Sequence, residues 1–365
     1  MNGRDPDSYS TLITAFLKLR WFMTRNDRFS AWVLTLLLFV PPASAQKYNI
    51  TDLGTFPGGN VSQGQAISKC GHVAGWARFP SFNSDGFFWS GRGLHVLDAL
   101  PPQGNVSFAE AINSSGDVAG YSTYDYPPYP NSHAVVWIQG KIHDLGTLPG
   151  SDDAQAMGMN DAGEVVGFSV PDAFLWTEQQ GMQDLGTLPG GSNSQAFGIN
   201  KRNEVVGSSD VADGNTYGFV WTKSTGMHAL PALPDGYSSS ANGINDLGQI
   251  VGGSSAGYDN NYAVLWTHDG KAVDLGVLPG QGWSSAFAIN NLGQVVGWSG
   301  YRAFIWSESE GMQDLNDLIP SNSGWVLGSA NGINDHGQIT GQGNINGESH
   351  GFVLTPTSEA PWACN

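Results

Sequence analysis

The sequence is short of positive charge. Lys and Arg together number 15 against 32 Asp and Glu, which leaves a formal net charge of −17 over 365 residues. A protein this acidic repels the phosphates of nucleic acids and of anionic membranes. We therefore exclude both as partners. Two interpretations of the acidic residues stay open: they keep the protein in solution, or acidic loops hold calcium, which prefers oxygen ligands.

Long apolar runs are also scarce. The run at residues 31–40, AWVLTLLLFV, is too short to span a bilayer and has the length of a signal-peptide core. Ala43-Ser44-Ala45 fits the small-residue site at which signal peptides are cleaved. We therefore expect residues 1–45 to be a signal peptide, with Met23 as an alternative start. Residues 46–365 would then be a secreted or periplasmic protein without a membrane span.

Cysteine and several enzyme motifs are nearly or wholly missing. The two cysteines, Cys70 and Cys364, either form one disulfide or remain two thiols, and neither lies in a metal-binding cluster. The sequence contains no His-Glu-x-x-His motif and no phosphate-binding loop. These absences exclude the commonest zinc-protease and nucleotide-binding sites.

A repeat fills the chain instead. The motif apolar-Asn-x-x-Gly-x-Val-x-Gly can be followed seven times, at spacings of 40 to 47 residues. Each unit reads as four short strands, and the third strand usually ends in Trp. Four strands in a period of about 40 to 50 residues are typical of a β-propeller blade. The final glycines of the motif are Gly75, Gly120, Gly167, Gly207, Gly252, Gly297 and Gly341.

The two ends of the repeat array complement each other. Residues 48–55 read as a fourth strand that precedes the first complete unit, whereas the last unit ends after its third strand at Gly351–Leu354. Pairing the N-terminal strand with that last unit closes a ring and leaves no strand edge free. We therefore predict an all-β fold, a single seven-bladed β-propeller closed by the N-terminal strand.

The opening of each third strand carries a resemblance to a known family. The triplets there include His133-Ala-Val, Arg302-Ala-Phe and His350-Gly-Phe. Together with Asp-Leu-Gly-Thr-Leu and Ile-Asn-x-x-Gly-x-Val-Val-Gly, they make residues 48–354 resemble the HAF-type bacterial extracellular repeat family. The resemblance implies an exported repeat protein, and it implies no activity.

Residues that recur in nearly every unit are interpreted as structural, because a closed ring needs one site whereas every blade needs packing. We expect the repeated Asn to form turns, the repeated Asp to bind local backbone, and the repeated Trp to pack between blades. The three series are Asn113, Asn160, Asn200, Asn245, Asn290 and Asn334; Asp52, Asp144, Asp184, Asp274 and Asp314; and Trp89, Trp137, Trp176, Trp221, Trp266 and Trp306.

Residues that differ between units are the functional candidates. The matching position of each innermost strand holds Gln65, Glu110, Met157, Phe197, Asn242, Phe287 or Asn331. For a metal site we name Glu110, Asn242 and Asn331, whose oxygens suit calcium. For catalysis we name Glu110, His133, Asp172 and His350, because a carboxylate or cation-bound water beside a neutral His could supply the activated water that hydrolysis needs. The simpler alternative is that these are polar residues at strand ends.

Aromatic and polar residues on the variable loops are the candidates for ligand binding, because exposed rings stack on sugars. The alternative is that they pack against the neighbouring blade. The leading hypothesis is a monomeric binding module for a glycan, a cell-surface component or a small molecule. The alternative is a calcium-dependent hydrolase acting on a lactone or ester, with its site on the face of the variable loops. The ligand-binding candidates are Asp85, Tyr126, Tyr217, Tyr258, Tyr262, Trp283, Arg302 and Trp325.

Overall fold

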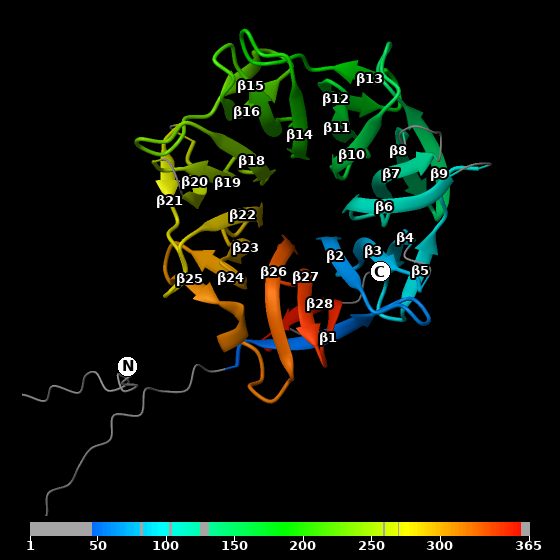
Figure 1. The fold of residues 1–365 in the computed structure, drawn as a ribbon, viewed down its shortest axis with the longest axis vertical. Helices are drawn as coiled ribbons and strands as arrows, with labels where there is room; N and C mark the ends of the chain where they lie inside the picture. The colour runs from blue at the N-terminus through cyan, green and yellow to red at the C-terminus, as the bar shows by residue number, and fades with distance from the viewer. Residues whose placement is uncertain are drawn as a thin grey trace, which may run out of the picture. The chain divides into compact units, whose positions relative to one another are not determined.

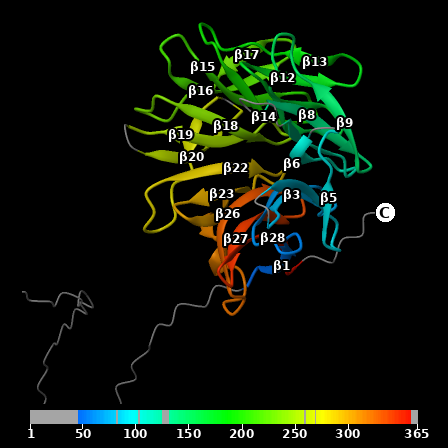
Figure 2. The ribbon, with the colours of Figure 1, turned by 45° about the vertical axis from the view of Figure 1, so that its right-hand side comes forward.

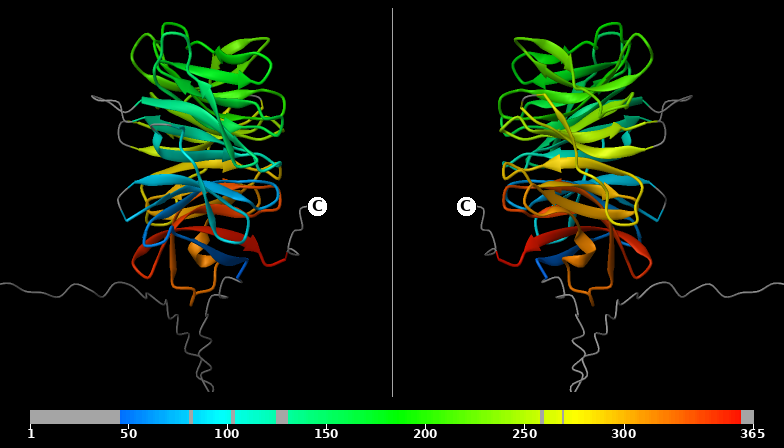
Figure 3. Two further views of the ribbon diagram at one scale, coloured as in Figure 1. Left: turned by 90° about the vertical axis from the view of Figure 1, so that its right-hand side faces the viewer. Right: turned by 90° about the vertical axis from the view of Figure 1, so that its left-hand side faces the viewer.

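The chain folds into a ring of four-stranded antiparallel sheets. A computed structural model describes residues 46–80, 83–101, 104–124, 131–257, 260–268 and 270–358. Their strands form seven sheets around a central channel (Figure 1), and Figure 3 shows the ring edge-on with loops along both faces. The prediction of an all-β, seven-bladed propeller is confirmed.

Six sheets take their four strands in chain order, with the first strand innermost (Figure 1). A short 3-10 turn, η1 (Leu315–Asp317), follows the sixth sheet. The strands of these sheets are β2 (Ser62–Ile67), β3 (Val73–Arg78), β4 (Ser84–Trp89) and β5 (Leu94–Leu97); β6 (Gly104–Ile112), β7 (Val118–Tyr124), β8 (Asn131–Ile138) and β9 (Lys141–Gly146); β10 (Ala154–Met159), β11 (Val165–Ser169), β12 (Asp172–Thr177) and β13 (Gly181–Asp184); β14 (Ser194–Ile199), β15 (Val205–Asp210), β16 (Thr216–Thr222) and β17 (Gly226–Ala229); β18 (Ser239–Ile244), β19 (Ile250–Ser255), β20 (Asn261–Trp266) and β21 (Ala272–Asp274); and β22 (Ser284–Ile289), β23 (Val295–Ser299), β24 (Arg302–Ser307) and β25 (Gly311–Asp314).

The seventh sheet joins the two ends of the repeat array. It contains β26 (Trp325–Ile333), β27 (Ile339–Ile345), β28 (Glu348–Pro356) and, outermost, the N-terminal strand β1 (Tyr48–Gly54). β1 lies beside β28 (Figure 2). The two strands pair antiparallel, with Tyr48 opposite Pro356. The predicted closure by the N-terminal strand is thereby confirmed.

Each innermost strand carries a β-bulge at one equivalent residue. The repeated glycine of the second strand lies next to this bulge. It is glycine because a Cβ on Gly167 or Gly297 would clash with a carbonyl oxygen of the first strand. A bulge changes the direction of a side chain. The repeated glycine therefore permits a close approach that positions one side chain per sheet. The bulged residues are Gln65, Glu110, Met157, Phe197, Asn242, Phe287 and Asn331.

Buried serines connect neighbouring sheets. The hydroxyl of Ser194 accepts the backbone N–H of Ala173 at 2.8 Å, and that of Ser284 accepts the N–H of Ala263 at the same distance. Each serine begins an innermost strand and bonds the third strand of the preceding sheet. Sequence reasoning assigned these serines no role, although their recurrence in register was an available signal. Ser62, Ser107 and Ser239 make the equivalent bond.

The three repeated series have the structural roles expected of them. Asp184 accepts the backbone N–H of Gly186 at 2.7 Å, as a local backbone contact. Asn290 accepts two N–H groups of its own turn, and its Nδ2 also donates to the carbonyl of Asn334 in the next sheet at 3.0 Å. Trp266 is buried and donates its Nε1–H to the carbonyl of Pro231. The repeated Asn thus has a second role, which is to link adjacent sheets.

The predicted signal peptide, residues 1–45, lies outside the described residues. Cys70 is disulfide-bonded, and the second cysteine of the sequence, Cys364, also lies outside them. Within the described part of the chain, no helix has the length and apolar character needed to cross a bilayer.

Candidate functional site

A cavity of about 850 Å³ occupies one end of the central channel. The β23–β24 turn contributes Gly300 and Tyr301 to its lining, so the cavity opens on the face where second strands connect to third strands. This is the face to which the variable loops were assigned. All seven bulged residues line the cavity.

The opposite end of the channel is lined by apolar side chains. The last residue of each innermost strand is Ile, except in the third sheet, where it is Met159. These residues lie between the bulged residues and a smaller opening of about 360 Å³, which the Asn turns surround. We call this set the isoleucine ring: Ile67, Ile112, Met159, Ile199, Ile244, Ile289 and Ile333.

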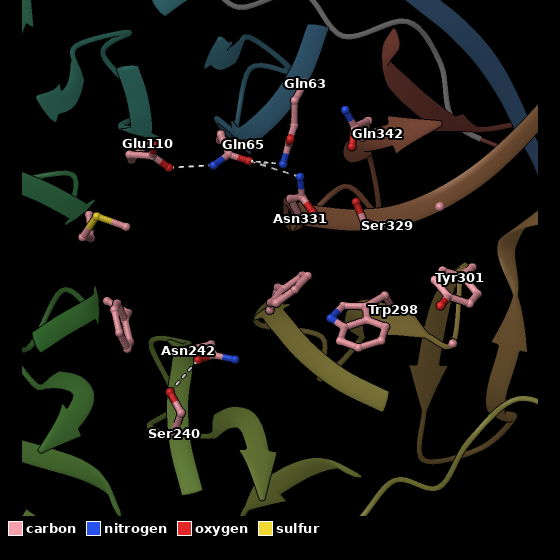
Figure 4. A pocket seen from close by; sticks show the side chains of 15 residues that line it. Gln63, Gln65, Glu110, Ser240, Asn242, Trp298, Tyr301, Ser329, Asn331 and Gln342 are labelled. Atoms are coloured by element: carbon pink, nitrogen blue, oxygen red, sulfur yellow. Dashed lines mark hydrogen bonds between the residues drawn. The ribbon is translucent and has the colours of Figure 1, made fainter. Parts of the chain in front are cut away.

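One side of the cavity is a hydrogen-bonded wall. We call Gln63, Gln65, Glu110, Asn331 and Gln342 the amide wall (Figure 4). Gln65 is its centre, because its Oε1 accepts from Gln63 at 2.8 Å and from Asn331 at 3.2 Å. Its Nε2 donates to Glu110 Oε2 at 2.7 Å. The wall offers both donors and acceptors to a bound molecule.

Glu110 is the single charged residue among the described residues that line this cavity. Burial raises the pKa of its carboxyl above the ordinary value, and the hydrogen bond from Gln65 acts in the opposite direction. The second carboxyl oxygen, Oε1, has no hydrogen-bond partner in the described structure. This oxygen is therefore open to the cavity, and no opposite charge lies among the described residues that line it.

The other side of the cavity is aromatic. We call Phe197, Phe287, Trp298 and Tyr301 the aromatic wall; Figure 4 shows Trp298 and Tyr301 across the cavity from the amide wall, on the side where Asn242 also lies. Tyr301 is 81% exposed at the rim, and its ring lies edge-on to that of Trp283, with centroids 6.3 Å apart. The aromatic surface thus continues from the cavity onto the outer face.

The residues proposed for calcium do lie in the channel, but they do not form a suitable donor set. Calcium takes six to eight oxygen ligands, usually with several carboxylates. Here Glu110 is the one carboxylate, and its neighbour Gln65 directs an N–H donor towards it. Asn242 bonds a backbone carbonyl through Nδ2 and the Ser240 hydroxyl through Oδ1. In the described residues, no three His, Cys, Asp or Glu are grouped to hold a metal.

The two histidines proposed for catalysis lie on third strands and bond to fourth strands. His133 Nδ1 on β8 lies 3.0 Å from the carboxylate of Asp144 on β9. His350 Nδ1 on β28 lies 2.9 Å from the carboxylate of Asp52 on β1. Both histidines therefore contact the repeated Asp, which also binds its own local backbone.

In other sheets, different side chains at the start of the third strand also lie beside the repeated Asp of the fourth strand. Arg302 bonds Asp314 on β25, and Asp172 lies near Asp184 on β13. Burial and then the charge of Asp184 raise the pKa of the Asp172 carboxyl. None of the third-strand candidates lines the cavity that holds Glu110. The structure thus does not bring the four proposed catalytic residues together.

The proposed ligand-binding residues that the structure describes lie outside the cavity lining. Tyr217 and Tyr262 pack against the buried clusters between sheets, and Trp325 lies beside the rings of His350 and Phe352. Asp85 accepts the backbone N–H of Ser107, which belongs to the next sheet. Trp283 is partly exposed beside the rim. The remaining two, Tyr126 and Tyr258, lie outside the described residues.

Sequence reasoning missed part of the cavity. Trp298 and Gln342 occupy the position directly after the repeated glycine of the second strand, and Gln63 lies two residues before the bulge. The available signal was variation at these positions between repeats, since other sheets carry Phe168 or Ser208 after the glycine. Tyr301 had a weaker signal, an aromatic residue in a two-residue hairpin turn.

Known proteins resemble this chain in fold. No protein-family profile and no curated protein matches it. A puromycin hydrolase is 12% identical with a TM-score of 0.50, over 75% of this chain and 47% of its own. A gluconolactonase from Xanthomonas campestris is 8% identical with a TM-score of 0.43, over 86% and 92%. A sialidase from Trypanosoma rangeli is 8% identical with a TM-score of 0.44, over 84% and 58%. At such identities the likeness concerns the fold alone.

Proposed function

We propose that this protein is an exported binding module that holds a glycan in the cavity of its channel. One observation carries the proposal: the amide wall faces the aromatic wall across a cavity of about 850 Å³. That volume lies within the range of about 300 to 1,000 Å³ found for small-molecule sites.

The two walls match the two kinds of surface on a sugar. The C–H face of a pyranose ring is apolar and stacks on rings such as Trp298 and Phe287, whereas its hydroxyls need both donors and acceptors. Gln and Asn side chains supply both from one amide group. The exposed ring of Tyr301 extends the stacking surface to the rim, which fits an oligosaccharide better than a single sugar.

Hydrolysis has less support than binding. Most glycoside hydrolases use a pair of carboxyl groups that flank the bond to be broken. The cavity lining includes one carboxylate, Glu110, and no histidine among the described residues. The calcium-dependent lactonase alternative requires a cation, and the donor set around Glu110 does not fit calcium. Binding without turnover is therefore the function that we propose.

The cellular setting is part of the same proposal. The apolar run at residues 31–40 and the resemblance to HAF-type repeats support export to the periplasm or out of the cell. The net charge of −17 argues against nucleic acid as a partner.

Titration calorimetry with defined tetrasaccharides tests the proposal. We expect Trp298→Ala to weaken binding by about tenfold or more, because one stacking contact is lost with its buried area. Leu292→Ala, on an exposed side chain of the β22–β23 turn outside the cavity lining, is the matched control and should leave affinity unchanged. Equal affinity in the Trp298→Ala protein would place the site elsewhere. Release of products that a chelator suppresses would instead favour the hydrolase.

A further inference from the structure

Glu110 is the one charged residue among the seven bulged residues. Six of the seven bulged residues are uncharged, and they include the amides Gln65, Asn242 and Asn331. The same backbone bulge therefore forms with neutral side chains of several shapes. The fold does not require a carboxylate at this position, so the charge of Glu110 calls for another explanation.

The surroundings of Glu110 make its charge costly. Its side chain is partly buried in the lining of the cavity, and its one hydrogen bond comes from the neutral amide of Gln65. No Lys, Arg or His is among the described residues that line the cavity. An isolated buried carboxylate is destabilising unless an opposite charge or several hydrogen bonds compensate it. The free oxygen of Glu110 is therefore available for a group that the ligand brings.

The residues that line the cavity also favour one sign of charge on a bound ligand. An anionic ligand would meet the carboxylate with no basic residue to offset it, so the cavity disfavours acidic sugars. A cationic nitrogen would pair with Glu110, and the neighbouring bulged residues Met157 and Phe197 are compatible with an organic cation, since aromatic faces attract positive charge. A bare divalent ion lacks the oxygen ligands that it needs here.

We propose that the glycan bound in the channel carries an amino group, and that this ammonium group lies against the carboxylate of Glu110. This inference rests on the proposed function, because it names the class of glycan for the same cavity. The amide wall then bonds the hydroxyls, and the aromatic wall packs on the ring faces.

A matched pair of tetrasaccharides tests the amino group alone. The probes are the β-1,4-linked glucosamine tetramer and cellotetraose, which differ only in the 2-amino group that replaces the 2-hydroxyl on each sugar unit. Calorimetry would be run at about pH 6, where an amine next to an electron-withdrawing group is largely protonated. We expect the wild-type protein to prefer the amino tetramer by about ten- to a hundredfold, as for a hydrogen bond between charged groups.

Two variants separate the pairing from general electrostatics. Glu110→Gln should abolish the preference, so that the amino tetramer and cellotetraose bind the variant with equal affinity. This variant should fold, because Gln65 occupies the equivalent bulge of the first sheet. Glu348→Gln removes the same charge from an exposed outer position and should keep the preference.

The outcomes distinguish the two proposals. A preference that survives in Glu110→Gln, or no preference in the wild type, overturns the amino-sugar inference. The glycan-binding proposal would still stand in that case if Trp298→Ala weakened both probes. Absence of binding by either tetramer at millimolar concentration would overturn both proposals.

Discussion

His350 and Asp52 are 298 residues apart in the sequence, and the imidazole Nδ1 of His350 lies 2.9 Å from the carboxylate of Asp52. His133 and Asp144 make the same contact within one sheet, 11 residues apart. The contact therefore belongs to the repeat, between the opening of a third strand and the Asp of a fourth. In the seventh sheet the fourth strand comes from the N-terminus, so this local contact also joins the two ends of the ring.

Deleting residues 46–55 should destabilise the protein strongly. The deletion removes β1 and leaves the edge of β28 unpaired, along with the buried side chains of Tyr48 and Leu53. We expect a loss of several kcal/mol, a large part of the usual total of about 5–15 kcal/mol. Urea unfolding of the mature protein measures it. As a control, His350→Ala should cost only about 1 kcal/mol, because water screens its ion pair with the exposed carboxylate of Asp52. An unchanged unfolding midpoint in the deletion would contradict closure by β1.

Replacing Asn290 by Ala should be costly for a single polar residue. Asn290 is buried, accepts N–H groups of Leu292 and Gln294, and donates to the carbonyl of Asn334 in the next sheet. Leaving these buried groups unpaired should cost about 2–4 kcal/mol. Leu292→Ala, at a side chain 68% exposed in the same turn, should change stability by no more than about 0.5 kcal/mol. Chemical denaturation compares the two, and equal effects would remove the proposed link between sheets.

Replacing Glu110 by Gln should stabilise the ligand-free protein at neutral pH. Burial raises the pKa of the folded carboxyl above its unfolded value. Below the pKa that Glu110 has in the unfolded chain, its carboxyl is protonated in both states and the burial costs no charge. As the pH rises through the higher pKa of the folded state, the buried carboxyl ionises and the free energy of unfolding falls. We expect a gain on the order of 1 kcal/mol for the variant at pH about 7, and no gain below pH about 4. Thermal melts across that range provide the measurement. A gain that does not vary with pH would show that the charge is not the cause.

Cleavage after Ala45 is expected during export. The apolar run at residues 31–40 and the Ala-Ser-Ala ending motivate this prediction. N-terminal analysis of exported protein should find Gln46 first, in its free or cyclised form. An exported protein that keeps residues 31–40 would contradict it.

A disulfide between Cys70 and Cys364 is also expected. Cys70 is bonded in the structure, and Cys364 is the only other cysteine in the sequence. Thiol titration of the unfolded, unreduced protein should find no free thiol, and reduction should release two. Two free thiols before reduction would rule the bond out.

The sequence by itself determined the number of sheets, their strand order and the closure of the ring. These features follow from local backbone preferences of strands and turns. Because the same residue pattern recurs at the same positions of every repeat, these preferences can be recognised in the sequence. The unequal ends of the array showed that residues 48–55 must complete the last sheet. The same register also identified the seven channel positions, because equivalent residues of a ring lie at equivalent depth.

The tertiary structure decided which of the differing residues act together. In sequence, Glu110, His133, Asp172 and His350 are alike as ionisable exceptions to the repeat. The packing of the sheets directs His133 and His350 to the fourth strands, where the repeated Asp engages them. It directs Glu110 into a cavity with Trp298, which belongs to a sheet four places further along the chain. Side-chain direction and distance across a ring depend on how whole sheets pack, and no local pattern encodes them.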